Sequence, residues 1–176
     1  SDVTVGFVGT MAPYYRDTGI PFLRTKNIRA GHIDRRDMAW IDDEFNSRIK
    51  KSSLREGDVV VARTGTPGVA AVIPRDLSGS NCSDMVIVRP GPELDPRWFS
   101  YYMNSLAKGW VRATTVGAVQ QHFNVASAQE MSILLPTLET QHAIAEVLGA
   151  LDDKIAANRQ FMETASELQQ AMWAGS

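Results

Sequence analysis

The chain of 176 residues has the length of one domain with at most an appendage. It carries 18 Lys and Arg against 20 Asp and Glu, a formal net charge of −2, and its 44% hydrophobic content excludes wholesale disorder. No apolar run approaches the roughly 18 residues of a transmembrane helix, and no basic, apolar leader opens the chain. The single cysteine, Cys82, excludes an internal disulfide, so we expect a cytoplasmic protein that does not enter a membrane.

Positive charge gathers in the first part of the chain. Residues 1–75 have a charge balance of +3, whereas residues 76–176 have a balance of −5. Five cations fall within one short stretch and are opposed there only by Asp34: Arg24, Lys26, Arg29, Arg35 and Arg36. Clustered positive charge is typical of phosphate binding, although a solvated charged surface gives the same count. The net charge alone therefore does not exclude a nucleic-acid ligand.

Up to residue 137 the sequence predicts short strands, turns and few helices. Apolar and β-branched runs predict strands at residues 3–8, 20–24, 59–63, 69–73, 85–89 and 132–136. Residues 64–68, rich in glycine and proline, join two of these strands into a hairpin. Asp95 caps a predicted helix that has Pro96 at its first position and ends at Gly109. Because the connections between strands are short, we expect an α+β fold with mainly antiparallel strands.

A different pattern begins after Pro136. From residue 138 to 173 the chain holds no proline and one glycine. Nine residues recur there in steps of four and three: Ile144, Leu148, Leu151, Ile155, Asn158, Met162, Ala165, Gln169 and Met172. This spacing is the a/d seam of a coiled coil, in which the polar Asn158 and Gln169 would fix the register. We expect a long helix that binds a partner; the alternative is a terminal helix lying across the domain's own core.

Residues that could carry catalysis are scattered. His32, His122 and His142 lie in unlike contexts, no pair of them has metal-ligand spacing, and Cys82 stands alone. A nucleophilic Cys82 assisted by a distant histidine is an open alternative, but a buried small hydrophobe is the favoured interpretation. The glycine-rich hairpin turn lacks the Lys-Ser/Thr end of a phosphate-cradling loop. The sequence therefore predicts no catalytic set and no metal site.

Residue types that contact DNA bases are more evident in the sequence than a catalytic set. Arginine and lysine pair with guanine edges, and asparagine and glutamine pair with adenine. Such polar side chains fall on three segments: Arg24, Lys26 and Asn27 after a strand, Arg63, Thr64 and Thr66 at the hairpin tip, and Gln120, Gln121 and His122 in a polar loop. Any one of these segments alone is usually just a polar loop. Together they fit a DNA-binding surface better than an active-site cleft.

These segments resemble, in the same order, the motifs of one family, the type I restriction–modification DNA specificity subunits. Residues 19–28 with 31–34 resemble the opening of the family's target recognition domain, residues 51–60 with 63–65 its middle motif, and Gly117 with 120–124 its later loop. The conserved helical region of the family is matched by residues 135–141 with Ile144, by 151–155 and by Asn158. The resemblance covers nearly the whole chain.

The resemblance implies a fold and a task. Residues 1–137 would form a target recognition domain that reads one half of a split sequence in double-stranded DNA. Residues 138–176 would form a spacer helix that pairs antiparallel with its counterpart and docks modification subunits. S-adenosylmethionine would be held by the modification subunits, and ATP and Mg by the restriction subunits, with no cofactor on this chain. Family members usually carry two such halves in tandem, so this chain is a half-length subunit or an excised half.

We therefore expect a non-catalytic specificity subunit of the prokaryotic cytoplasm, associated with the nucleoid. Its three segments would contact about three to five base pairs in the major groove, and two copies pairing through the seam would recognise a two-fold symmetric, gapped site. Three alternatives stay open: a recognition domain of a fused methyltransferase–nuclease, a coiled-coil scaffold that does not read DNA, and a hydrolase that depends on Cys82.

Overall fold

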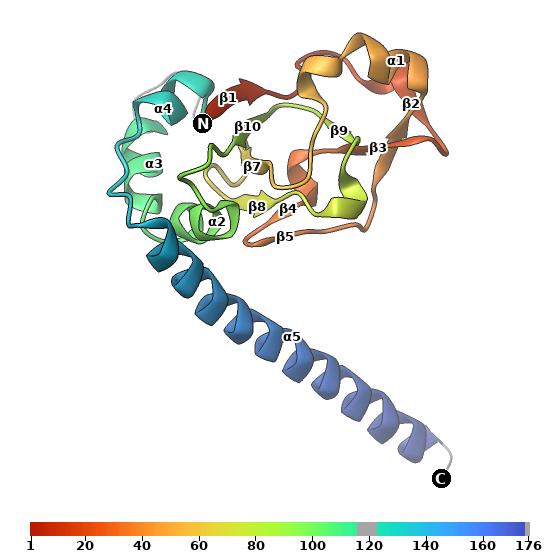
Figure 1. Ribbon diagram of the computed structural model, residues 1–176. Coiled ribbons are helices and arrows are strands. Elements are labelled where there is room, and N and C mark those ends of the chain that lie inside the picture. Colours follow the sequence, from red (N-terminus) through yellow and green to blue (C-terminus); the bar gives the residue numbers. More distant parts are fainter. Residues whose placement is uncertain (116–122, 175–176) are drawn as a thin grey trace.

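The computed structural model describes residues 1–115 and 123–174, and Figure 1 shows a globule from which one long helix extends. Four strands form the main antiparallel sheet, in the order β1 (Asp2–Val5), β10 (Met85–Arg89), β7 (Val59–Ala62) and β8 (Ala70–Val72). A second sheet has the order β2 (Tyr15–Arg16), β6 (Ala39–Ile41), β3 (Ile20–Leu23) and β9 (Asn81–Cys82). The strands β4 (Ile28–Arg29) and β5 (His32–Ile33) form a separate hairpin.

Helices occupy most of the remaining chain. The α-helices are α1 (Asp43–Arg48), α2 (Pro96–Asn104), α3 (Lys108–Thr115), α4 (Val125–Glu130) and the long α5 (Leu138–Ala174). Short 3-10 turns are η1 (Ala12–Tyr14), η2 (Thr25–Asn27), η3 (Lys50–Ser52) and η4 (Arg75–Leu77). All strand pairs of the described chain are antiparallel except β3 with β9. The predicted α+β fold with mainly antiparallel strands and a long terminal helix is confirmed.

The core explains why β7 is apolar throughout. Successive side chains of a strand point to opposite faces of the sheet. Val59 and Val61 pack with Phe99 and other residues of α2, whereas Val60 packs in a different cluster with Leu23 of the second sheet. All three valines are fully buried. A strand that is covered on both faces needs a continuous apolar run rather than an alternating one.

Two predicted elements are wrong. The helix that Asp95 caps ends at Asn104, whose side chain donates to the carbonyl of Ala70 (2.8 Å) and accepts from its N–H (3.1 Å), which ties the helix end to β8. Gly109 lies inside the next helix, α3. Residues 132–136 form no strand. An apolar run becomes a strand only beside another strand, and this segment instead packs Ile133 onto the core next to α2.

A buried glutamine fixes the start of α5. The side chain of Gln141 is fully buried, and its Nε2 donates to the carbonyls of Glu93 and Pro136 (both 2.9 Å). Its Oε1 accepts from the backbone N–H of Asp95 (2.8 Å). Asp95 in turn caps α2 by accepting from the N–H of Trp98 (2.7 Å). Gln141 thus joins the first turn of α5 to the first turn of α2.

After its first turns, α5 leaves the globule. The carbonyl of Ala145 accepts from Arg97 (3.1 Å), and Asp152 accepts from the hydroxyl of Tyr101 (2.8 Å). Burial and this hydrogen bond raise the pKa of Tyr101 to about 12. Every residue from 151 to 173 is exposed, and Figure 1 shows this part of the helix projecting from the globule. The alternative of a helix lying across the domain's core is therefore wrong for most of its length.

Replacing Gln141 by alanine is expected to lower the free energy of unfolding by about 2–4 kcal/mol, because backbone groups of residues 93, 95 and 136 would lose their buried partner. Urea denaturation measures the change. Gln160, an exposed glutamine of the same helix, provides the matched control, and Gln160→Ala should change stability by less than about 0.5 kcal/mol. Equal stability of the two variants would contradict the anchoring role of Gln141.

Candidate nucleic-acid interface

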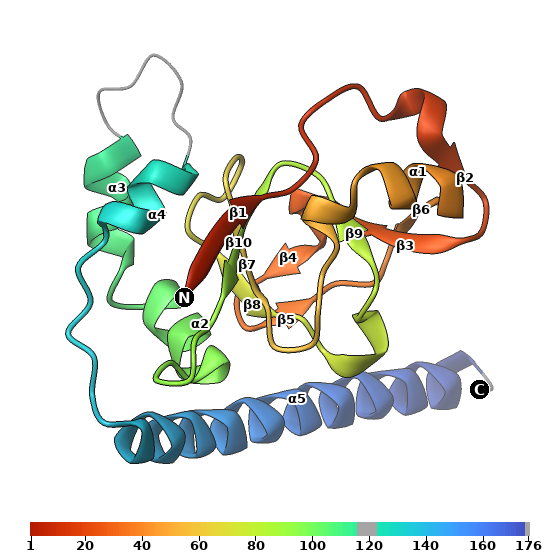
Figure 2. The same cartoon turned by 45° about the horizontal axis from the view of Figure 1, so that its top comes forward.

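Two of the predicted DNA-binding segments meet at the turn between β9 and β10, residues 83–84, where the chain passes from the second sheet to the main sheet. The N–H of Ser83 donates to the carbonyl of the last residue of β3 (3.0 Å). The first residue of β10 pairs with the last residue of β7. Arg24 follows β3 and Arg63 follows β7, so both flank this turn. In Figure 2 the loops after β1, β7 and β9 lie on the edge of the globule that faces away from α5.

Arg63 is held in an ion pair at this turn. Its Nη1 donates to Oδ1 of Asp84 (2.5 Å), with the Arg63 side chain 18% and the Asp84 side chain 38% exposed. The hairpin that follows has Thr64 half-buried and Thr66 exposed at its tip. Gly68 closes the hairpin at φ 86°, and a Cβ there would lie 2.9 Å from a side chain of α3. Glycine is therefore required at this position on both counts.

Arg24 and Lys26 share one acidic neighbour. The guanidinium of Arg24 donates to the backbone carbonyl of Asp37 and lies over the ring of Tyr15, 5.7 Å from its centroid. The Nζ of Lys26 lies 3.5 Å from Oδ2 of Asp37, and half of the Lys26 side chain is exposed. Both cations therefore reach the surface in orientations that their neighbours set.

Asn27 supports this segment from inside. Its side chain is fully buried, with Oδ1 accepting from the N–H of Arg24 (3.0 Å) and Nδ2 donating to the carbonyls of Asp34 (3.0 Å) and Arg36 (3.2 Å). The prediction that Asn27 contacts DNA does not fit this arrangement, because its amide faces inward. Asparagine binds the backbone of its own loop as readily as a ligand, and the sequence pattern does not distinguish the two.

The basic cluster is largely paired within the fold. Asp34 lies 2.7 Å from Arg36 and 3.4 Å from a second arginine of the cluster. Hydrogen bonds from Arg36 hold the pKa of the Asp34 carboxyl well below its usual range. Arg35 pairs with Asp76 on η4 (2.6 Å). Asp34 is the only acidic residue within this stretch, but in the fold Asp37 and Asp76 also reach its cations.

The third predicted segment, Gln120, Gln121 and His122, lies outside the described residues, so its role stays a prediction. Phe123, which follows it, is buried and donates its N–H to the carbonyl of Arg63 (3.3 Å). Phe123 itself thus lies beside the β7–β8 hairpin.

Sequence reasoning missed the two aspartates that hold the predicted cations, Asp37 and Asp84. One signal was present for both, since each stands just before a strand, β6 or β10. Aspartate at such a place is typical of a tight turn, because it tolerates the left-handed conformation. The pairing of each aspartate with a particular cation depends on the tertiary fold.

Two features of the described residues bear on catalysis. No three of their His, Cys, Asp and Glu side chains are grouped so as to hold a metal ion. Cys82 is fully buried, and burial raises the pKa of its thiol, whereas a nucleophilic cysteine needs a lowered one. This geometry disfavours the hydrolase alternative. In the same ranges, no helix combines the length and apolarity needed to cross a membrane.

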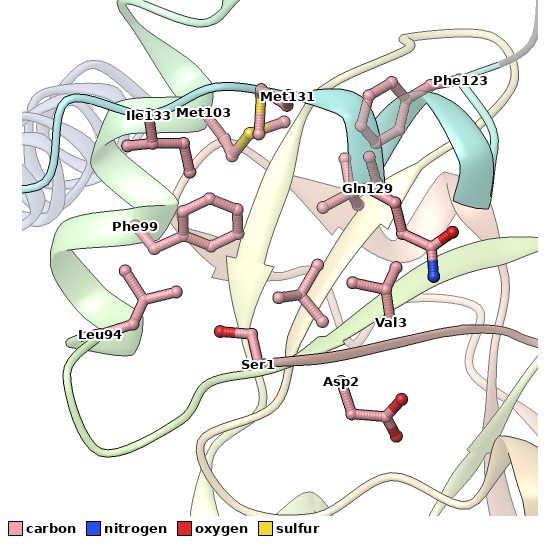
Figure 3. Close-up of a pocket in the computed structure, with 13 residues that line it drawn as sticks. Ser1, Asp2, Val3, Leu94, Phe99, Met103, Phe123, Gln129, Met131 and Ile133 are labelled. Carbon is pink, nitrogen blue, oxygen red and sulfur yellow. The ribbon is translucent and has the colours of Figure 1, made fainter.

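An apolar pocket of about 310 Å³ lies between β1, α2 and the segment after α4. Figure 3 shows Phe99, Met103 and Ile133 among the side chains around it. The carboxylate of Asp2 lies instead near Arg89 on the neighbouring strand (3.5 Å). The pocket is lined mainly by apolar side chains, with Ser1 and Gln129 as its uncharged polar ones.

Comparison with known proteins gives a consistent result. Residues 11–164 match the family model described as type I restriction modification DNA specificity domain. The chain is 24% identical over 144 residues to the type I restriction enzyme EcoBI specificity subunit of Escherichia coli, an alignment that covers 78% of this chain and 30% of that protein. The chain thus spans less than a third of the length of this curated relative.

Solved structures share the fold. One chain, from a structure concerned with complex assembly and conformational transition of the type I R-M system, has a TM-score of 0.70 at 21% identity, over 96% of this chain and 40% of that one. The HsdS subunit from Thermoanaerobacter tengcongensis has a TM-score of 0.59 at 19% identity, over 89% and 42% respectively.

The thiol of Cys82 is expected to react with a disulfide reagent only when the domain unfolds, because it is buried and its pKa is raised. The rate of labelling in native buffer and in urea measures this. A Thr66→Cys variant in a Cys82→Ser background places a thiol at an exposed position and should react at once. Rapid native labelling of Cys82 would restore the hydrolase alternative.

Proposed function

We propose, from the premise that the chain belongs to the type I restriction modification DNA specificity domain family, that residues 1–137 read one half of a split sequence in double-stranded DNA. The observation that carries this proposal is the attachment of both segments to one turn, where Ser83 bonds the residue before Arg24 and Asp84 pairs with Arg63. Two separated stretches of sequence thus bring cations to the same turn, and arginine and threonine side chains suit base-edge and phosphate contacts.

Individual roles follow from exposure. Thr66 and Lys26 are the more exposed of the side chains and suit phosphate contacts, whereas Arg63 is half-buried, oriented, and suits a guanine edge. Arg24 suits either task. Gln120, Gln121 and His122 would add further base-edge or phosphate contacts.

The reactions would belong to partner subunits. Modification subunits would hold S-adenosylmethionine and methylate the site, and restriction subunits would use ATP and Mg to cleave DNA. This chain would be non-catalytic and would act in the prokaryotic cytoplasm on nucleoid DNA. The burial of Cys82 supports this division of labour, as does the lack of a metal-binding cluster among the described residues.

The seam of α5 supports pairing of two copies. Its apolar members from residue 151 onward are exposed, as is Ile144, whereas Leu148 is half-buried next to the face that holds the buried Gln141, Ala145 and Gly149. Asn158 is the middle one of the nine seam positions, with four on either side. Antiparallel pairing centred on Asn158 would bring the two Asn158 side chains together at the two-fold axis, where their amides can bond each other.

Deleting the gene in cells that carry the partner subunits is expected to abolish methylation at one gapped DNA motif. Reintroducing the gene with Arg63→Gln should reduce methylation at that motif, or weaken the base requirement at one position of the motif. The reason is that a bidentate arginine–guanine contact contributes about 1–3 kcal/mol of discrimination between bases. Methylome sequencing measures both. Arg159→Gln, which removes an exposed cation from α5, is the control expected to restore the motif. An unchanged methylome after deletion would refute the proposed function.

An Asn158→Cys variant is expected to form a covalent dimer under mild oxidation, because antiparallel pairing places residue 158 opposite itself. The measurement is non-reducing electrophoresis in a Cys82→Ser background. Gln160→Cys is the matched control, since Gln160 lies off the seam, about 200° around the helix from Asn158, and this variant should stay monomeric. Cross-linking at residue 160 but not at 158 would contradict this register.

A further inference from the structure

Two aspartates in the described chain adopt a backbone conformation that L-residues rarely take. Apart from glycines, the described residues with positive φ are Asp37 (52°) and Asp84 (37°). Strain of this kind persists where the surrounding structure enforces it, and it concentrates at functional sites. Both strained residues carry a carboxylate, and both bind cations of the candidate interface.

At Asp84 the strain is enforced by the junction of the two sheets. The N–H of Asp84 donates to the carbonyl of Phe7 (3.0 Å), while the preceding residue is bonded to the end of β3. This backbone directs the carboxylate onto Nη1 of Arg63 (2.5 Å). The Arg63 side chain is 18% exposed at this anchor, and its Nε is buried without a hydrogen-bond partner among the described residues.

Asp37 binds cations through both its backbone carbonyl and its carboxylate. Its carbonyl accepts from the guanidinium of Arg24, and its carboxylate lies 3.5 Å from Nζ of Lys26. The carboxylate is 82% exposed, so the ion pair stands at the surface where a phosphate would arrive. A phosphate that binds Lys26 must displace this carboxylate or share the ammonium group of Lys26 with it.

We propose that Asp84 and Asp37 are positioning residues that make DNA binding selective by holding the interface cations in oriented ion pairs; this rests on the proposed function. A free arginine or lysine attracts any phosphate, and such attraction is independent of sequence. A carboxylate beside it cancels that attraction and fixes the direction of the remaining N–H groups. Binding then depends on an acceptor placed to suit that direction, which a particular base edge supplies.

The requirement for a carboxylate separates this proposal from a purely structural role. Asparagine adopts positive φ as readily as aspartate and is nearly the same size, so Asp84→Asn keeps the turn and removes the charge. If Asp84 serves only the turn, the asparagine variant should behave as the wild type. If Asp84 restrains Arg63, the variant should free the Arg63 guanidinium to bind DNA phosphates of any sequence.

The test measures binding of the full chain to a pool of short duplexes of randomised sequence, at several salt concentrations, with sequencing of the bound fraction. Asp84→Asn is expected to bind the pool about 3–10-fold more tightly at low salt, with a salt dependence steeper by about 0.9 in log–log slope, as one added phosphate contact predicts. Enrichment of the motif selected by the wild type should fall. Asp37→Asn should act in the same direction.

Asp76→Asn is the matched control, because it breaks an aspartate–arginine pair of ordinary backbone conformation with the same change in net charge. The second control is Asp84→Asn in an Arg63→Gln background, where the proposal expects no further change. Equal effects of Asp84→Asn and Asp76→Asn, or an undiminished effect without Arg63, would overturn the proposal. If the wild-type chain with its partner subunits selects no motif from the pool, the proposed function itself fails instead.

Discussion

The candidate interface depends on one short passage of chain, the turn from β9 to β10. β9 pairs in parallel with β3, whereas β10 pairs antiparallel with β7, so the turn between them must bring the ends of β3 and β7 together. Backbone hydrogen bonds from Ser83 and Asp84 to two other segments fix the turn in place. Arg24 and Arg63, distant in sequence, become neighbours of the same turn for this reason. A change in either sheet would therefore alter the interface even if every cation were kept.

The long helix is coupled to this interface only through the globule. Successive residues of an α-helix are rotated by about 100°, so the face that holds Ala145 against α2 differs from the face that holds Ile144. One helix can thus be anchored on its own domain and still offer a continuous seam to a partner. The hydrogen bonds of Gln141 give the helix a defined angle at its origin. A rigid spacer needs such an anchor, because an angular error at the start grows along its length.

The sequence predicted those features that depend on local pattern. The apolar runs located β3, β7, β8 and β10, and the absence of proline located α5. Features that depend on contacts within the tertiary fold were not predicted. Asn27 has the residue type of a base-reading side chain, but its partners Asp34 and Arg36 lie inside the loop. Residues 132–136 have the composition of a strand, but Ile133 packs onto the core cluster that includes Phe99 instead. Gln141 belongs to a motif, yet only the fold shows that it binds residues 93 and 95.

The distribution of charge follows the same logic. A sum of −2 hides a basic part, and that basic part in turn contains carboxylates that pair with its cations across the fold. Such pairing lowers the field that the domain presents to DNA of any sequence, and with it the affinity that depends on counterion release. A domain that must find one site among many gains from this, because selectivity is a ratio and rises when non-specific binding falls. Under the proposed function, the nearly neutral recognition domain would therefore rely on its partner subunits for part of the contact with the DNA phosphates.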